Sequence, residues 1–323
     1  MVAMNFANRL LITFTGCLVL SGCKPSVGQP PYLITTDVLL AVRGEPPEAK
    51  PGANVTYSFL LASPSGNADG AVDSADALWD VCLTPKPPSE SNAVSSACAG
   101  VPDAGAATAG QTFAAPVPTK ACQLFGPIAP PPAAGQPAVR PRDPDSTGGY
   151  YLPVQVLLPN LATGALSGFA FERITCSLAN APSSVVADYN STYQPNLDPG
   201  IEYTELVDAA GTQRLDDGPQ SVPAGAVVTV EATFVAGSAE TFPVYDAQSE
   251  ALVDQQESLH MSWFVTGGTF AHDRTGVAAD ETASSTSNQW TAPTQPGDYF
   301  LWLVLRDSRG GTDYKSYEIQ VGS

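Results

Sequence analysis

The sequence predicts an all-β protein, and three observations carry this prediction. Segments rich in β-branched and aromatic residues alternate apolar and polar side chains at a period of two, which is typical of half-buried strands. Turn residues such as glycine, proline and asparagine bound these segments. After residue 22, helical periodicity never extends beyond three turns. We therefore expect strands to form nearly all of the regular structure.

The first β region is expected over residues 32–182. In residues 54–62 the apolar side chains fall on one face at a period of two, after a turn at Pro51-Gly52. An insertion rich in alanine, glycine and proline, at about residues 84–149, interrupts the region. Because long irregular stretches are unusual inside a compact domain, we expect the insertion to lie outside the basic fold. The expected strands are residues 36–42, 54–62, 77–83, 150–158 and 169–178.

A polar stretch at residues 183–200 has few apolar side chains, and we place a linker and the domain boundary there. The second β region then covers residues 201–323. Its clearest strand is residues 226–235, in which valine, alanine and phenylalanine alternate with polar residues. The expected strands are residues 201–207, 226–235, 259–265, 289–291, 298–307 and 312–321.

Several motifs in the second region carry a resemblance to a known family. They are Val222-Pro223-Ala224-Gly225, Trp263, Trp290-Thr291-Ala292-Pro293, Pro296-Gly297-Asp298-Tyr299 and Asp307-Ser308-Arg309-Gly310-Gly311. With these residues the region resembles a bacterial immunoglobulin-like or PKD-like module, although the acidic glycine turn of PKD domains is missing after Trp263. The resemblance implies a β-sandwich with Trp263 between its sheets and a tyrosine corner at Tyr299.

The first region resembles the same class more loosely, with Trp79 in the place that corresponds to Trp263. The expected fold class is therefore all-β, with two immunoglobulin-like β-sandwich domains in tandem. Such modules act as spacers, adhesins and carbohydrate-contacting units, so this class does not fix a function.

The N-terminal residues indicate export. Residues 10–20 are apolar and follow Arg9, and they are too short to span a membrane. They end in Leu20-Ser21-Gly22-Cys23, which resembles the bacterial lipobox. The resemblance implies removal of residues 1–22 and a lipid on Cys23, followed by a flexible tether at residues 23–31.

Other interpretations of this segment remain. Cys23 could be an ordinary thiol of a secreted protein, or the segment could stay uncut. Cys17 is a weaker lipidation candidate, because an aromatic residue, Phe14, stands first in its motif. Lys24 after the anchor favours the outer membrane or cell surface.

Four further cysteines, Cys82, Cys98, Cys122 and Cys176, indicate two disulfides in an exported chain. Three pairings are possible, and we favour Cys82–Cys98 with Cys122–Cys176. The first would close a local loop that stabilises the fold by about 3 kcal/mol. A zinc site is disfavoured because the spacing lacks a close cysteine pair.

Charge and composition exclude some functions. The formal net charge of −18 argues against nucleic-acid binding. The chain has only two histidines, His260 and His272, and nothing in the sequence places either beside a serine or an acid, so we expect no catalytic centre. Acidic groups that could bind calcium lack EF-hand spacing, and we expect them to be solvated turn residues. They are Asp69, Asp73, Asp76, Asp216, Asp217, Asp307 and Asp313.

The sequence thus predicts a non-catalytic lipoprotein of the cell envelope, with a structural, adhesive or protein-binding role and no cofactor or metal. The alternative is an accessory module that binds carbohydrate or another ligand for an extracellular polysaccharide or a secreted enzyme. The partner would be an envelope or extracellular protein or a glycan. Tyr189 and Tyr193, in the linker, are a further candidate for an exposed ligand platform.

Overall fold

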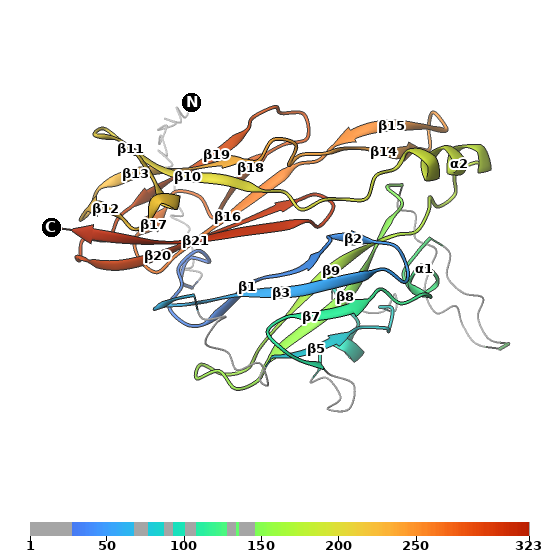
Figure 1. Cartoon of the computed structure of the whole chain (residues 1–323), viewed down its shortest axis with the longest axis horizontal. Coiled ribbons are helices and arrows are strands. Elements are labelled where there is room, and N and C mark those ends of the chain that lie inside the picture. The colour runs from blue at the N-terminus through green and yellow to red at the C-terminus, as the bar shows by residue number, and fades with distance from the viewer. Residues whose placement is uncertain are drawn as a thin grey trace, which may run out of the picture. The chain divides into compact units, whose positions relative to one another are not determined.

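The computed structural model describes residues 28–67, 77–86, 93–100, 108–127, 134–135 and 146–322. Residues from Pro31 onward form one compact unit whose regular structure is almost entirely β (Figure 1). The predicted all-β fold class is therefore confirmed. No helix in the described ranges combines the length and apolarity that a membrane crossing requires. Cys17 and Cys23 lie outside the described residues.

The first sandwich packs two sheets around Trp79, which is fully buried. Its ring stacks on Phe113 at 5.9 Å between centroids and lies 6.4 Å from Tyr57. One sheet contains β1 (Val38–Glu45), β3 (Asn54–Ser63), β4 (Gly66–Asn67) and β7 (Phe113–Pro116). The other has the order β2 (Glu48–Ala49), β9 (Leu166–Thr175), β8 (Gly149–Leu158), β5 (Leu78–Val81) and β6 (Thr108–Ala109).

The second sandwich encloses Trp263 and Trp290, both buried. Tyr299 forms the expected tyrosine corner, because its hydroxyl donates to the carbonyl of Gln295 at 3.0 Å. One sheet has the order β11 (Gly211–Arg214), β10 (Ile201–Asp208), β13 (Val227–Phe234), β19 (Ser285–Thr291) and β17 (Thr269–Phe270). The other has the order β12 (Gln220–Pro223), β21 (Thr312–Gly322), β20 (Gly297–Asp307), β16 (Leu259–Val265) and β18 (Arg274–Val277).

Part of the predicted insertion belongs to the first sandwich, contrary to our expectation. β7 pairs with β3 in antiparallel register, and its Phe113 packs in the aromatic core. The disulfides Cys82–Cys98 and Cys122–Cys176 fasten other described parts of the insertion to the sandwich, in the pairing that we favoured. The second of them joins the short helix α1 (Ala121–Leu124) to the residue after β9.

The predicted linker is structured. Helix α2 (Ser183–Thr192) packs against the hairpin of β14 (Thr241–Asp246) and β15 (Ala251–Gln256), which the sequence analysis missed (Figure 1). Tyr189 is 1% exposed and Tyr193 is 9% exposed, and their rings stack at 4.7 Å. The prediction that these tyrosines form an exposed platform is therefore wrong, because both rings pack in the apolar cluster between α2 and the hairpin.

The two sandwiches pack directly on each other. Residues 32–34, which we expected to open the first region, instead pair with β16, and Val265 N donates to Tyr32 O at 2.8 Å. On the outer face of β20, Trp302 and Val304 are buried against β1 and β3. The chain therefore contacts the second sandwich before and after it builds the first.

Candidate functional site

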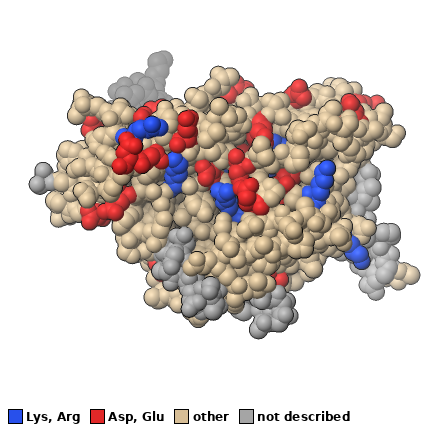
Figure 2. Space-filling view, in the orientation of Figure 1, with Lys and Arg blue, Asp and Glu red and all other residues tan. Residues whose placement is uncertain are grey.

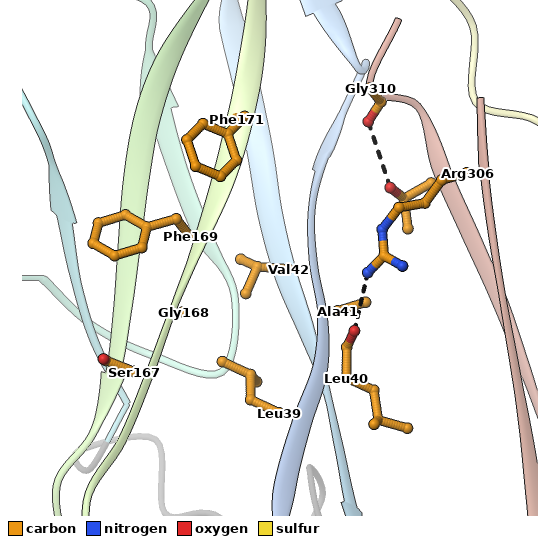
Figure 3. A pocket seen from close by; sticks show the side chains of 11 residues that line it. Leu39, Leu40, Ala41, Val42, Ser167, Gly168, Phe169, Phe171, Arg306 and Gly310 are labelled. Atoms are coloured by element: carbon orange, nitrogen blue, oxygen red, sulfur yellow. Dashed lines mark hydrogen bonds between the residues drawn. The ribbon is translucent and has the colours of Figure 1, made fainter. Parts of the chain in front are cut away.

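A groove of about 340 Å³ lies where the two sandwiches meet, and we call it the junction groove (Figure 3). Strand β1 passes between β9 on one side and the segment that carries Arg306 and Gly310 on the other. The lining residues are 39–42 of β1, 167–169 and 171 of β9, and residues 306, 310 and 312.

Strands β1 and β9 lie side by side at the groove without forming a ladder. Among the described strands, β1 pairs only with β3, and β9 pairs with β2 only at Arg173 and Ile174. On the side away from β8, residues 166–172 of β9 lie next to β1. Side chains therefore line the groove between these two strands.

The walls of the groove are apolar and aromatic. Leu39 and Val42 face Phe169 and Phe171, and Phe171 is 41% exposed. Gly168 allows the Leu39 side chain to pack closely on β9, because a Cβ at this position would collide with that side chain. The exposed ring of Phe171 and its apolar neighbours together offer a contact surface to a ligand.

The groove also contains an arginine without an acidic partner. Arg306 Nη2 donates to Leu40 O at 3.0 Å, and a bulge in β1 between Leu39 and Ala41 takes this carbonyl out of the regular register. Within the described ranges, no carboxylate forms an ion pair with Arg306. Burial and the nearby Arg274 lower the pKa of Arg306.

Arg306 belongs to a basic patch that it forms with Arg274 and His260. His260 stands opposite Arg306 across β16 and β20, and Arg274 stands opposite Ser262 across β16 and β18. These residues share the outer face of the sheet, since their neighbours in sequence point into the core. The patch is unusual for this chain, which has 32 acidic and 14 basic residues, and acidic side chains predominate in the view of Figure 2.

Behind the groove, a buried set of polar side chains holds the two sandwiches together. We call Glu48, Arg173, Tyr193, Glu257 and Arg309 the junction network. Tyr193 Oη donates to Glu48 Oε2 at 2.7 Å and accepts from Arg309 Nη1 at 3.1 Å. Arg173 Nε lies 3.2 Å from Glu48 Oε2, and Arg309 Nε lies 2.6 Å from Glu257 Oε1. First sandwich, linker and second sandwich each contribute to the network.

Burial sets the electrostatics of this network. It raises the pKa of Glu257 to about 7, with repulsion from Asp307 added and Arg309 acting against it. It also raises the pKa of Tyr193 to about 12, so the hydroxyl stays protonated and can donate to Glu48. Loss of one member of such a buried set leaves its partner's charge without compensation. The network therefore fixes the walls of the groove.

The turn after β20 has its own fixed geometry. Asp307 Oδ1 accepts backbone N–H groups from Arg309, Gly310 and Gly311, at 2.8, 2.7 and 2.9 Å. Gly310, with a φ of 109°, then lines the groove. The turn thus positions both Arg309 in the network and the groove wall.

The structure separates the two histidines. His260 Nε2 lies 3.3 Å from Ser258 Oγ on an exposed surface, a proximity that the sequence alone did not indicate. His272 instead exchanges backbone hydrogen bonds with the Asn288 side chain. In the described part of the chain, neither histidine takes part in an ion pair.

Three of the acidic candidates have structural contacts, which we did not expect. Asp307 is buried in its turn, and Asp313 Oδ2 accepts from Ile201 N at 2.8 Å. Asp216 pairs with Lys315 at 2.6 Å, which helps to lower the pKa of this carboxyl. Asp217 is exposed, as expected, and Asp69, Asp73 and Asp76 lie outside the described residues. Among the described residues, no group of three acidic, histidine or cysteine side chains could hold a metal ion.

The sequence analysis missed the groove. It assigned residues 169–178 to a strand but did not ask which of their aromatic side chains face outward. The signal was present, however, because Phe169 and Phe171 alternate with the inward-facing Ala170. Two phenylalanines on the outer face of a strand indicate a surface with a further role.

The chain matches no protein-family model, and no curated protein matches it. Solved structures with similarity include latent PorU from Porphyromonas gingivalis, with 13% identity and a TM-score of 0.23 over 89% of this chain. The tandem Ig repeats of Dlar show 12% identity and a TM-score of 0.22 over 90% of this chain and 99% of that one. The adhesin InvE of Yersinia pseudotuberculosis shows 12% identity and a TM-score of 0.22 over 92% of this chain.

This chain spans 24% of the PorU chain and 62% of the InvE chain. At such low identities and TM-scores, these similarities carry no argument about function.

Proposed function

We propose that this protein is a non-catalytic, protein-binding component of the bacterial cell envelope, anchored by a lipid on Cys23, which holds a segment of another envelope or extracellular protein in the junction groove. The observation that carries the proposal is the groove itself. It combines Arg306, which has no acidic partner among the described residues, with an exposed phenylalanine, Phe171, between two sandwiches that a buried network fixes in place.

Two features support the cellular location. The disulfides Cys82–Cys98 and Cys122–Cys176 fit an oxidising compartment, which agrees with export. The lipobox at residues 20–23 supports membrane attachment.

The non-catalytic role has support in the same region. Glu48, Arg173 and Tyr193, whose chemistry could serve catalysis, are buried and hydrogen-bonded to one another. Buried and bonded to one another in this way, these side chains are suited to hold the two sandwiches together rather than to act on a substrate.

The test is photo-crosslinking in the native host. Phe171→p-benzoylphenylalanine places the probe in the groove, and Val253→p-benzoylphenylalanine on β15 is the matched control, because Phe171 and Val253 are 41% and 43% exposed. We expect position 171 to give a discrete protein adduct whose crosslinked residue, located by mass spectrometry, lies in one short segment. Equal labelling from both positions, or adducts with glycan alone, would contradict the proposal.

A further inference from the structure

The groove carries enough chemistry to define what it binds. On the basis of the proposed function, we infer that the bound segment is a peptide with an aspartate or glutamate side chain that pairs with Arg306, and with apolar side chains next to that acid. Three features lead to this occupant: an arginine without an acidic partner in the described residues, the charge around it, and the apolar wall of the groove.

Arg306 differs from the other arginines at the junction. Arg173 pairs with Glu48, and Arg309 pairs with Glu240 and Glu257. In the part of the chain that the structure describes, Arg306 binds only a neutral carbonyl, that of Leu40. A guanidinium has five N–H donors in a planar fork that fits a carboxylate. Because Arg306 is half-buried and lacks a carboxylate partner in so acidic a chain, we expect a bound ligand to supply that carboxylate.

The basic patch strengthens this preference. Arg274 stands on the same sheet face as Arg306, and its positive charge disfavours a bare guanidinium there. A carboxylate bound to Arg306 would relieve this repulsion, whereas a cationic segment would increase it. Charge complementarity thus selects an acidic occupant.

The apolar wall selects a peptide rather than a small anion. Leu39, Val42, Phe169 and Phe171 line the same groove as Arg306, and Phe171 is 41% exposed. Apolar side chains next to the acid of a bound peptide would pack on this wall. A free anion could pair with Arg306 but would leave the apolar wall uncovered.

The experiment selects displayed random nine-residue peptides on the full-length protein. We expect the enriched peptides to share one acidic position with apolar residues beside it. In the best synthetic peptide, replacement of that acid by its amide should weaken binding about 10- to 100-fold, the range of a charge-assisted hydrogen bond. The same replacement should have little effect on binding to R306Q, because this variant has already lost the pair between Arg306 and the peptide acid.

Three variants make the result decisive. R306K should retain part of the affinity, and R214Q should bind like the wild type, because Arg214 stacks on Tyr203 at a different sheet. Circular dichroism and thermal unfolding establish that each variant is folded. F171S should weaken every selected peptide, whether or not the peptide contains an acid.

The outcomes separate the inference from the proposed function. Two outcomes overturn the inference and leave the proposed function standing. In the first, the selected peptides depend on Phe171 but contain no acid. In the second, replacement of the acid by its amide weakens binding to R306Q as much as binding to the wild type. Failure to enrich any peptide that depends on Phe171 overturns both. Displacement of the peptide by dextran sulfate in an Arg306-dependent manner would assign the site to an anionic glycan and overturn the peptide inference.

Discussion

At Glu172 a carboxyl group lies inside the first sandwich, 2% exposed, and neither of its oxygens has a hydrogen-bond partner among the described residues. It stands beside the core side chains Val55 and Tyr57, where Gly44 leaves room for it. Burial raises the pKa of Glu172 to about 9, and repulsion from Asp198, Glu48 and Glu45 adds to the effect. The group is therefore protonated at neutral pH in the folded protein.

This residue predicts a pH dependence of stability. The pKa in the folded state lies above the ordinary value of 4.5, so the folded state holds a proton that the unfolded state loses. The stabilisation is complete below pH 4.5 and is lost as the pH rises toward about 9. The loss through this window should be on the order of 1 kcal/mol per pH unit.

Denaturant unfolding at pH 5 and pH 8 measures the effect against Glu172→Gln, which stays neutral. We expect the free energy of unfolding of the wild type to fall relative to that of the variant between the two values. Glu202→Gln, at an exposed position, serves as the control and should follow the wild type. A constant difference between wild type and Glu172→Gln would show that Glu172 is ionised in the folded state.

At the scale of elements, the hydroxyl of Tyr193 is the point where linker and sandwiches meet. Tyr193→Phe removes the donor to Glu48 and the acceptor for Arg309 while it keeps the ring. Because both partners are buried and charged, we expect the free energy of unfolding to fall by about 1–3 kcal/mol. Tyr245→Phe, in the same apolar cluster, should cost much less, and equal losses in urea titrations would contradict this role.

The two disulfides should contribute unequally. Cys82–Cys98 spans 16 residues and Cys122–Cys176 spans 54. In the chain-entropy model these loops correspond to about 3 and about 4 kcal/mol. We therefore expect the paired Cys→Ser variant of the longer loop to lose about 1 kcal/mol more of its unfolding free energy, as thermal or chemical denaturation would show. A larger loss from the short loop would contradict the entropic reasoning.

The strands that sequence patterns predicted well are those with one apolar face, such as β3 and β13. β14 and β15 were missed because they form a separate hairpin, whose apolar side chains pack on α2 rather than in the core of a sandwich. β20 has apolar residues on both faces, whereas an alternating pattern predicts one apolar and one polar face. Trp302 and Val304 fill its outer face because the first sandwich covers it.

Sequence patterns did not predict the candidate site either. It depends on pairing between distant segments, since Arg306 reaches the carbonyl of Leu40 266 positions away. Local alternation predicts which face of a strand is apolar, but it does not predict which segments lie beside that strand. The position of Arg306 beside β1 follows from the packing of the two sandwiches.

At the scale of the whole molecule, the sandwiches share a buried boundary rather than a free hinge. The apolar contact of Trp302 and Val304 with β1 and β3 lies beside the buried pairs of Arg173 and Arg309. A ligand in the junction groove would therefore meet walls that need little ordering, which lowers the entropic cost of binding. Attachment to a membrane would place this groove at the envelope.

The anchor itself is open to a direct measurement. Protein purified from its native membrane without reduction should give a peptide that begins at Cys23 and carries the mass of a diacylglycerol. The same sample should contain Cys82–Cys98 and Cys122–Cys176 as intact disulfides, since export and oxidation belong to one route. Cys23→Ser provides the control, and we expect it to leave the membrane fraction, because burial of acyl chains supplies the attachment at about 0.8 kcal/mol per methylene. An unmodified Cys23 together with free thiols at Cys82 and Cys98 would contradict both the anchor and the compartment.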